Sequence, residues 1–366
     1  LIDKNSNLKF FCDLKKITKS LKKNFKNIEF IALELTEKIL SNIKDKKFLI
    51  DKNTCSLYFE SLILKKNKIL ELNDPIYGFK AIKSHLEIEN IKSAHIHDGI
   101  ALTKYLFWIK KNFLKKKITE ISGSEKLLQF RKRNKKFKNL SFPTISGTGP
   151  NAAIIHYKPS RKTNRTLKKG DIYLVDSGGQ YEFGTTDVTR TISLQNTDQR
   201  IKNIFTRILK GHIAVSNFNL KMNSTGSKID FVARKFLKNI GLNYSHGTGH
   251  GVGYFLNVHE GPHSISPKNK IKFQEGMVVS NEPGYYEKNN FGIRIENLIY
   301  VKKTKKRNYF ENLTMAPIDK DLINIHLLNS HEKDWLNRYH KKVFLNLKKA
   351  MNKTEFLQLQ KACSAI

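Results

Sequence analysis

The stretch HGTGHGVGYFLNVHEGP, from His246 to Pro262, combines three histidines with five glycines. The whole chain of 366 residues holds only 12 histidines, so this concentration of imidazole needs a chemical explanation. Repeated glycines weaken helices and strands, but they allow a backbone to come close to another group. The glycines are not followed by the Gly-Lys-Ser/Thr sequence of a nucleotide-binding loop. We therefore expect the segment to bring imidazoles to a site whose other members lie elsewhere in the chain.

Four carboxylates in strand-like surroundings are the candidates for those other members. Asp176 follows the apolar run IYLV, and Asp187 lies eleven residues later in TTDVTR. Glu282 ends the run GMVVSNE, and Glu296 lies fourteen residues later in GIRIEN. Either aspartate alone would more simply cap a turn, but four carboxylates at the edge of a core are costly unless a cation neutralises them.

An imidazole from the opening stretch, for which we favour His250, would complete a mixed oxygen and nitrogen ligand set. Such a set suits Mn²⁺, Co²⁺ or Zn²⁺ better than a metal that prefers thiolates. Four carboxylates and one histidine exceed the needs of a single ion. The sequence therefore predicts two divalent ions about 3.5–4 Å apart, bridged by carboxylates.

The order of these residues, together with the motifs HGTGHGVG, HEGP and EPGYY, resembles the pita-bread metallopeptidases. That family includes methionine aminopeptidase, prolidase, aminopeptidase P and the metal-free creatinase. The stretches LSFPTISGTGPNAAIIHY, NEPGYYEKNNFGIRIEN and DWLNRYHKKV are similar to the cytosolic, three-domain aminopeptidase P group in particular. The resemblance covers roughly residues 70–350. It implies an α+β chain with a pita-bread catalytic domain, hydrolysis of peptides that carry proline in second position (Xaa-Pro-Yaa), Mn²⁺ as the preferred metal, and a homodimer.

The resemblance also implies a role for each metal ligand. Asp187 and Glu296 would bridge the two ions, Asp176 would complete one ion, and His250 with Glu282 would complete the other. A hydroxide between the ions would be the nucleophile, because bound metal lowers the pKa of water toward about 7.

Further side chains receive catalytic and substrate-binding roles from the same resemblance. Glu282 would carry a proton toward the leaving proline nitrogen, and His259 would hydrogen-bond the tetrahedral intermediate. His156 is expected both as a catalytic group and as a substrate contact. The expected substrate-binding residues are His156, His246, His259, Tyr286 and Arg294. His263 would either join this group or lie on the surface beside Pro262.

Three regions are expected around this site. Residues 1–82 read as a partial N-terminal α/β domain of the creatinase-like type, residues 83–306 as the catalytic domain, and residues 307–366 as a helical C-terminal extension. A long helical pattern occupies residues 83–116, and we interpret its His95 and His97 as packing or surface residues. Short strand-like runs, AAIIHY among them, follow it. The chain begins at Leu1 without methionine or a signal-peptide pattern, so we expect an N-terminal truncation.

Composition restricts the cellular setting. No apolar run approaches the roughly 18 residues that cross a bilayer, so no membrane partner is expected. The three cysteines, Cys12, Cys55 and Cys363, are widely spaced and form no CxxC pair. A disulfide framework and a thiolate metal site are therefore not expected, and the cytoplasm is the expected location.

The net charge of +35, from 67 basic and 32 acidic residues, raises the question of nucleic acid binding. Lysines are spread along the whole chain, which favours solvated faces over a dedicated surface. We therefore expect no specific nucleic-acid partner. The densest run, RKRNKKFK at residues 131–138, remains the best candidate for non-specific phosphate contacts.

Two other functions stay open beside the aminopeptidase. A prolidase would act only on Xaa-Pro dipeptides, and a metal-free pita-bread module would bind a partner without catalysis. In the tail, apolar residues recur at helical spacing and are expected to pack on the catalytic domain and to contribute to the homodimer: Trp335, Leu336, Tyr339, Val343, Phe344 and Leu347.

Overall fold

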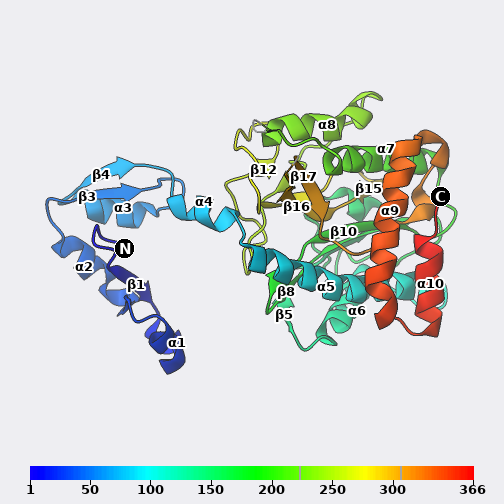
Figure 1. Ribbon diagram of the computed structural model, residues 1–366. Helices are drawn as coiled ribbons and strands as arrows, with labels where there is room; N and C mark the ends of the chain where they lie inside the picture. The colour runs from blue at the N-terminus through cyan, green and yellow to red at the C-terminus, as the bar shows by residue number, and fades with distance from the viewer. Residues whose placement is uncertain (222–223, 306) are drawn as a thin grey trace. The chain divides into compact units, whose positions relative to one another are not determined.

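The computed structural model describes residues 1–221, 224–305 and 307–366. It divides into two compact units, Leu1–Ile76 and Tyr77–Ile366 (Figure 1). The division falls inside helix α4 (Pro75–Ala81), whereas the sequence placed a boundary after residue 82. Lys306, the last residue of the expected catalytic region, lies outside the described residues. Among the residues described, no helix is both long and apolar enough to cross a membrane.

The first unit alternates short strands with short helices. Strand β1 pairs in parallel with β2, and β3 pairs in parallel with β4. The connections between paired strands are helical, as parallel pairing requires. Its small core contains Ile31, Leu40, Leu62 and Ile63. The elements are β1 (Leu8–Cys12), η1 (Leu14–Lys16), α1 (Lys19–Asn24), β2 (Ile28–Ala32), η2 (Leu33–Leu35), α2 (Thr36–Asn42), β3 (Lys47–Ile50), α3 (Leu57–Leu64) and β4 (Lys68–Glu71).

The second unit begins with the long helix that the sequence predicts. Helix α5 (His85–Asn112) starts at a capping box between Ser84 and Glu87, which satisfies backbone N–H groups at the helix start. His95 is buried in it and its Nδ1 donates to the carbonyl of Ile91, so the prediction of a packing histidine is confirmed. Helices α6 (Glu120–Lys132), α7 (Gln199–Ser216) and α8 (Gly226–Lys238) follow, and α7 packs against α8.

Antiparallel strands form the sheets of this unit. Strand β7 lies between β6 and β10, and β16 lies between β13 and β17. The strands are β5 (Phe137–Leu140), β6 (Ile145–Thr148), β7 (Ile172–Ser177), β8 (Gly179–Tyr181), β9 (Gly184–Thr185), β10 (Val188–Ser193), β11 (Gly249–His250), β12 (Ser264–Ile265), β13 (Val278–Asn281), β14 (Gly284–Glu287), β15 (Phe291–Arg294), β16 (Asn297–Lys303) and β17 (Asn308–Asn312). The mixture of helices and strands confirms the α+β class.

The run AAIIHY does not form the expected strand. The short helix η3 (Gly149–Ala153) covers its start, and the remainder is irregular. The buried carboxylate of Glu120 organises this segment instead of a strand partner. It accepts hydrogen bonds from the backbone N–H groups of Thr148 and Arg165 and from the Tyr157 hydroxyl, at distances of 2.9 Å. A short apolar run cannot reveal such a distant partner.

The C-terminal elements pack onto this unit, as predicted. Helix α9 (Ser330–Leu347) buries Trp335, Leu336, Tyr339, Val343 and Leu347, and Phe344 packs partly buried against the same cluster. Figure 1 shows α9 beside α10 (Lys353–Cys363) at the end of the chain. The short helices η4 (Lys320–Leu322), η5 (Ile325–Leu327) and η6 (Lys348–Ala350) complete the tail.

Candidate functional site

The four carboxylates meet because each pair lies across antiparallel strands. Asp176 in β7 pairs with Thr189 in β10, and Asp187 immediately precedes β10. Glu282 directly follows β13 and Glu296 directly precedes β16, which pairs antiparallel with β13. Local sequence therefore fixes two carboxylate pairs, and the packing of the two sheets brings the pairs together.

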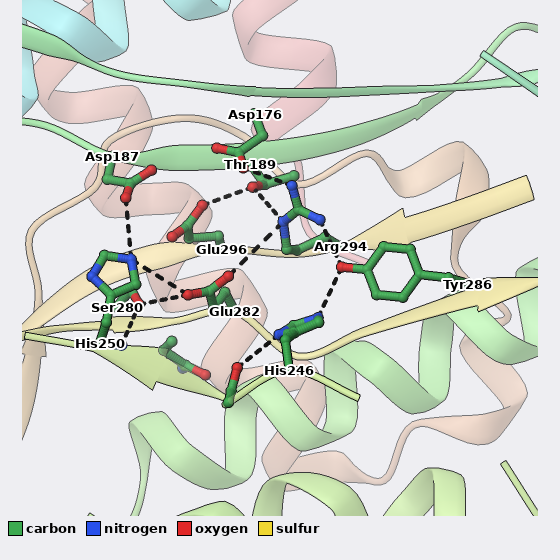
Figure 2. Close-up of polar contacts among 12 residues, drawn as sticks. Asp176, Asp187, Thr189, His246, His250, Ser280, Glu282, Tyr286, Arg294 and Glu296 are labelled. Carbon is green, nitrogen blue, oxygen red and sulfur yellow. Dashed lines mark hydrogen bonds and ion pairs between the residues drawn. The ribbon is translucent and has the colours of Figure 1, made fainter. Parts of the chain in front are cut away.

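The tightest part of the cluster is Asp187, His250 and Glu296, whose possible ligand atoms all lie within 4.8 Å of one another. Nε2 of His250 is 3.4 Å from Asp187 Oδ2 and 3.5 Å from Glu282 Oε1 (Figure 2). Nδ1 of His250 lies 3.1 Å from the carbonyl of Gly251, which can only accept, so Nδ1 carries a proton. Nε2 is thus the nitrogen that faces the carboxylates.

Asp176 and Glu282 lie beside this group and have other partners. One Asp176 oxygen accepts from the Arg294 guanidinium at 2.6 Å, and the other is buried with no hydrogen bond from the described residues. Glu282 Oε1 accepts from the Ser280 hydroxyl at 2.9 Å. Each carboxylate therefore has capacity left for a further ligand.

The electrostatics of the cluster are those of crowded negative charge. Burial raises the pKa of Glu282 to about 7, although His250 and Arg294 counteract it. Burial also raises the pKa of Asp187 and of Glu296, and the neighbouring carboxylates add to both shifts. Burial opposes protonation of His250, but its contact with Asp187 and the charge of Glu282 raise its pKa to about 9. A divalent cation would neutralise the same carboxylates, so this donor set fits a metal.

A chain of hydrogen bonds leads from Asp176 to His246 (Figure 2). Arg294 donates to Asp176 and, at 2.6 Å, to the Tyr286 hydroxyl. That hydroxyl donates to Nε2 of His246 at 2.9 Å, because Nδ1 of His246 donates to the carbonyl of Gly247. Burial and the Arg294 charge lower the pKa of His246 to about 4, which keeps the ring neutral.

The predicted site residues line a cavity of about 560 Å³. His259 and His156 are in its wall, and the His259 ring lies 4.2 Å from the His250 ring, centroid to centroid. Burial, with the charge of His250, lowers the pKa of His259 to about 4. Tyr286 lies outside this lining and contacts it through His246 and Arg294. The lining residues are Phe142, Pro143, Ile145, Ile155, His156, Lys158, Asp176, Asp187, His246, Gly247, Gly249, His250, His259, Glu282, Arg294 and Glu296.

His263 takes neither of the two expected positions. Only 1% of its surface is exposed, and its Nε2 bonds the carbonyl of Val278 at 2.7 Å. Its ring packs edge-on against Phe273, so it supports β13 from the core.

The glycines of the opening stretch serve backbone packing. A Cβ at Gly249 would lie 1.8 Å from the carbonyl oxygen of Ser280, and one at Gly251 would lie 2.1 Å from that of Glu260. The close approach that the glycines allow is therefore to neighbouring chain segments, and this packing positions His250.

Three polar residues of the site were not predicted from the sequence. Thr189 donates to Glu296 at 2.7 Å and accepts from Arg294 Nε at 3.1 Å, linking the two carboxylate pairs. Ser280 joins the backbone of His250 to Glu282. Lys158 lines the cavity two residues after His156. The sequence offered a signal for Thr189 alone, because antiparallel pairing of the two strand-like runs places it opposite Asp176.

Comparison with known proteins also indicates a metallopeptidase. Residues 89–303 match the model of metallopeptidase family M24, and residues 308–366 match the C-terminal region of that peptidase family. The chain belongs to metallopeptidase family M24. Its neighbours have the pita-bread fold, which confirms the expected architecture of the M24 region.

Individual relatives are similar over most of this chain. A probable Xaa-Pro aminopeptidase P of Laccaria bicolor is 45% identical over 323 residues, covering 85% of this chain and 50% of the relative. The X-prolyl aminopeptidase of Caenorhabditis elegans, described as a cytosolic enzyme with a dinuclear active site, is 31% identical with a TM-score of 0.91 and covers 98% of this chain and 62% of that one. A prolidase of Pyrococcus horikoshii is 26% identical with a TM-score of 0.67 over 80% of each chain. The chain spans about half the length of the curated relatives it matches.

Proposed function

We propose that this protein is a dinuclear-metal aminopeptidase that removes the N-terminal residue from peptides with proline in second position. One observation carries the proposal: four carboxylates and His250 converge on a single cavity whose wall also holds His156, His246 and His259. The names of the M24 relatives point to the same reaction.

Asp176, Asp187, His250, Glu282 and Glu296 would hold two divalent ions, with Asp187 and Glu296 shared between them. The oxygen-rich set with one imidazole suits Mn²⁺ best, with Co²⁺ or Zn²⁺ as alternatives. When bound, the ions would polarise the peptide carbonyl and lower the pKa of water. The unpartnered oxygen of Asp176 and the raised pKa values of the other carboxylates support this occupancy.

The protein's own groups would then bind the peptide and move a proton. Glu282, which lies beside His250 in the cavity wall, would take a proton from water and pass it to the proline nitrogen. His259 would donate to the oxygen that gains charge at the scissile carbonyl, and His156 would assist from the same wall. His246, which burial and the Arg294 charge keep neutral, would contact the substrate together with the Arg294–Tyr286 pair.

The apolar part of the wall supports a proline substrate. Phe142, Pro143, Ile145 and Ile155 line the same cavity as the ligands. A pyrrolidine ring offers no N–H within a peptide and gains from apolar contact. We further infer a homodimer in the cytoplasm; the C. elegans neighbour is described as cytosolic.

A prolidase is the second candidate, because prolidases are among the solved neighbours. The two enzymes differ in whether a residue beyond proline is accepted. A panel of Xaa-Pro dipeptides and Xaa-Pro-Yaa tripeptides, assayed with and without added Mn²⁺, separates them. Metal-dependent cleavage of the tripeptides supports the aminopeptidase, and cleavage of dipeptides alone would replace it with the prolidase.

A metal-free binding module is the third candidate. It predicts a protein that purifies without a stoichiometric ion and cleaves no peptide of the panel. Metal analysis of the purified protein therefore tests it directly. Four mutually repelling carboxylates, three of them buried and Glu282 partly buried, disfavour this alternative, because nothing in a binding module requires their cost.

A further inference from the structure

We propose that Lys158 forms a subsite for a peptide carboxylate on the leaving-group side of the scissile bond. The proposal rests on the proposed function and adds to it a preference for substrates that carry negative charge after proline. Lys158 lies in the cavity lining, in the same segment as His156.

The backbone of this segment directs Lys158 toward the cavity. His156 and Lys158 both line the cavity, whereas the intervening Tyr157 is 4% exposed and its hydroxyl donates to Glu120 Oε2 at 2.9 Å. Pro159 follows and restricts Lys158 to extended conformations, in which alternate side chains point to opposite sides. The anchor at Tyr157 therefore holds its two neighbours on the cavity side.

Lys158 also has a free charge. Within the described parts of the chain, its ammonium forms no ion pair or hydrogen bond. The other permanent cation of the lining, Arg294, is already bound to Asp176. Lys158 is thus the lysine of the cavity wall that remains available for an incoming anion.

The distribution of charge in the cavity matches a short zwitterionic peptide. Asp176, Asp187, Glu282 and Glu296 make one part acidic, and Lys158 adds a positive charge to the same wall. A cavity of about 560 Å³ is within the range of small-ligand sites. An Xaa-Pro-Yaa tripeptide has an amine at one end and a carboxylate two residues beyond the scissile carbonyl. Its carboxylate, or an acidic side chain at the third position of a longer peptide, is the anion that Lys158 would bind.

Two matched peptide pairs test the proposal and separate the two sources of carboxylate. Ala-Pro-Ala with a free carboxylate is compared with its C-terminal amide, and Ala-Pro-Glu amide is compared with Ala-Pro-Gln amide. Wild-type protein should show a KM about two- to fivefold lower for the charged member of at least one pair, the range for a partly exposed ion pair. The pair that shows the preference identifies the carboxylate.

Lys158→Gln should abolish that preference by raising the KM of the charged peptide to that of its uncharged partner. Lys162→Gln is the matched control, because Lys162 is exposed in the same segment but outside the cavity lining. Lys158→Glu should reverse the preference. The subsite would be overturned if the ratio of KM values within each peptide pair were the same in wild type and in Lys158→Gln. It would also be overturned if Lys158→Gln and Lys162→Gln lost the preference for the charged peptide equally.

Calorimetry measures the binding of the same peptides to metal-depleted protein, where no cleavage is expected. This measurement tests the subsite independently of the proposed activity. A protein that binds the charged peptides more tightly through Lys158 but cleaves none would support the subsite and refute the aminopeptidase. Cleavage of all four peptides without a Lys158-dependent preference would support the aminopeptidase and refute the subsite.

Discussion

Asp187, His250 and Glu296 form the tightest group among the proposed ligands. The other two carboxylates, Asp176 and Glu282, lie beside this group and have partners of their own. Arg294 binds Asp176 directly, and Ser280 donates to Glu282. Burial and the other carboxylates raise the pKa values of Asp187 and Glu296, the two carboxylates of this tightest group. These two residues are therefore the ones whose loss should affect both ions.

The first prediction concerns Asp187 and Glu296. Asp187→Asn and Glu296→Gln should each lose both divalent ions, because a neutral amide cannot bridge two cations as a carboxylate does. Metal content per chain by mass spectrometry is the measurement. Glu125→Gln, on the exposed side of α6, is the control and should keep two ions. A variant at Asp187 or Glu296 that retained two ions would refute its bridging role.

The second prediction separates catalysis from metal binding. His259→Ala should keep the metal content of wild type but lower kcat by roughly two orders of magnitude or more, a typical loss for one transition-state donor. The exposed His326 supplies the control substitution, His326→Ala. Near-normal turnover in His259→Ala would remove this histidine from the mechanism.

The sequence predicted which residue types would meet but not how they would share partners. The four carboxylates and His250 were found because each stands beside a strand-like run or within a glycine-rich motif. The link from Arg294 to Asp176 joins residues 118 positions apart, and no local pattern records it. His263 directly follows the motif that holds His259, yet packing against Phe273 and Val278 places it in the core.

At the scale of elements, helix α9 is held by polar contacts as well as by its apolar face. The Tyr339 hydroxyl donates to the carbonyl of Ala316 and accepts from Arg190, both at 2.8 Å. Nε2 of His340 accepts from the backbone N–H of Ile318 at 3.1 Å. A protonated imidazole would present a donor to that donor, so His340 must stay neutral in the folded chain.

The third prediction is a pH dependence of stability that arises at His340. Burial, with the charges of Lys320 and Arg190, lowers its pKa from 6.5 to about 3. Between these values the unfolded chain binds a proton that the folded chain does not, so stability falls as pH decreases below 6.5. One such group removes about 2 kcal/mol between pH 7 and pH 5.

His340→Gln should remove this part of the pH dependence, because a glutamine oxygen can accept from Ile318 but does not titrate. The free energy of unfolding in urea is measured at pH 7 and pH 5 for wild type, His340→Gln and the exposed control His331→Gln. The difference between the two pH values should be about 2 kcal/mol smaller for His340→Gln alone. An unchanged difference would show that His340 is protonated in the folded chain.

Elements also show where sequence patterns fail. The long helix and the tail helices were predicted because their apolar positions recur over many residues. The run RKRNKKFK was read as a possible phosphate-binding face, but Arg131 is fully buried and binds Asp98 through two hydrogen bonds of 2.7 and 3.0 Å. Lys136 and Lys138 both pair with Glu182. Charge density along the chain could not reveal these partners.

At the scale of the whole molecule, the charge of +35 should act only as a diffuse field. The fourth prediction is that duplex oligonucleotides of unrelated sequence bind with equal affinity, and that this affinity falls steeply with salt, because released counterions drive such binding. Fluorescence anisotropy with two labelled duplexes over a salt series is the measurement. A preference for one sequence that persisted at high salt would indicate a specific nucleic-acid surface.

The division into two units leads to the last prediction. Every residue that lines the cavity lies between Phe142 and Glu296, and the apolar clusters of the second unit begin at Ala81. The members of the metal cluster all belong to the second unit, Tyr77–Ile366. A chain that starts at Tyr77 should therefore fold and bind the same number of ions as the longer chain. It should also keep the thermal unfolding transition that belongs to the second unit. Metal analysis and scanning calorimetry of the two chains make the comparison. Loss of the ions or of that transition would mean that the second unit needs the first one to reach its structure. The site would then belong to the whole chain and not to the M24 region alone.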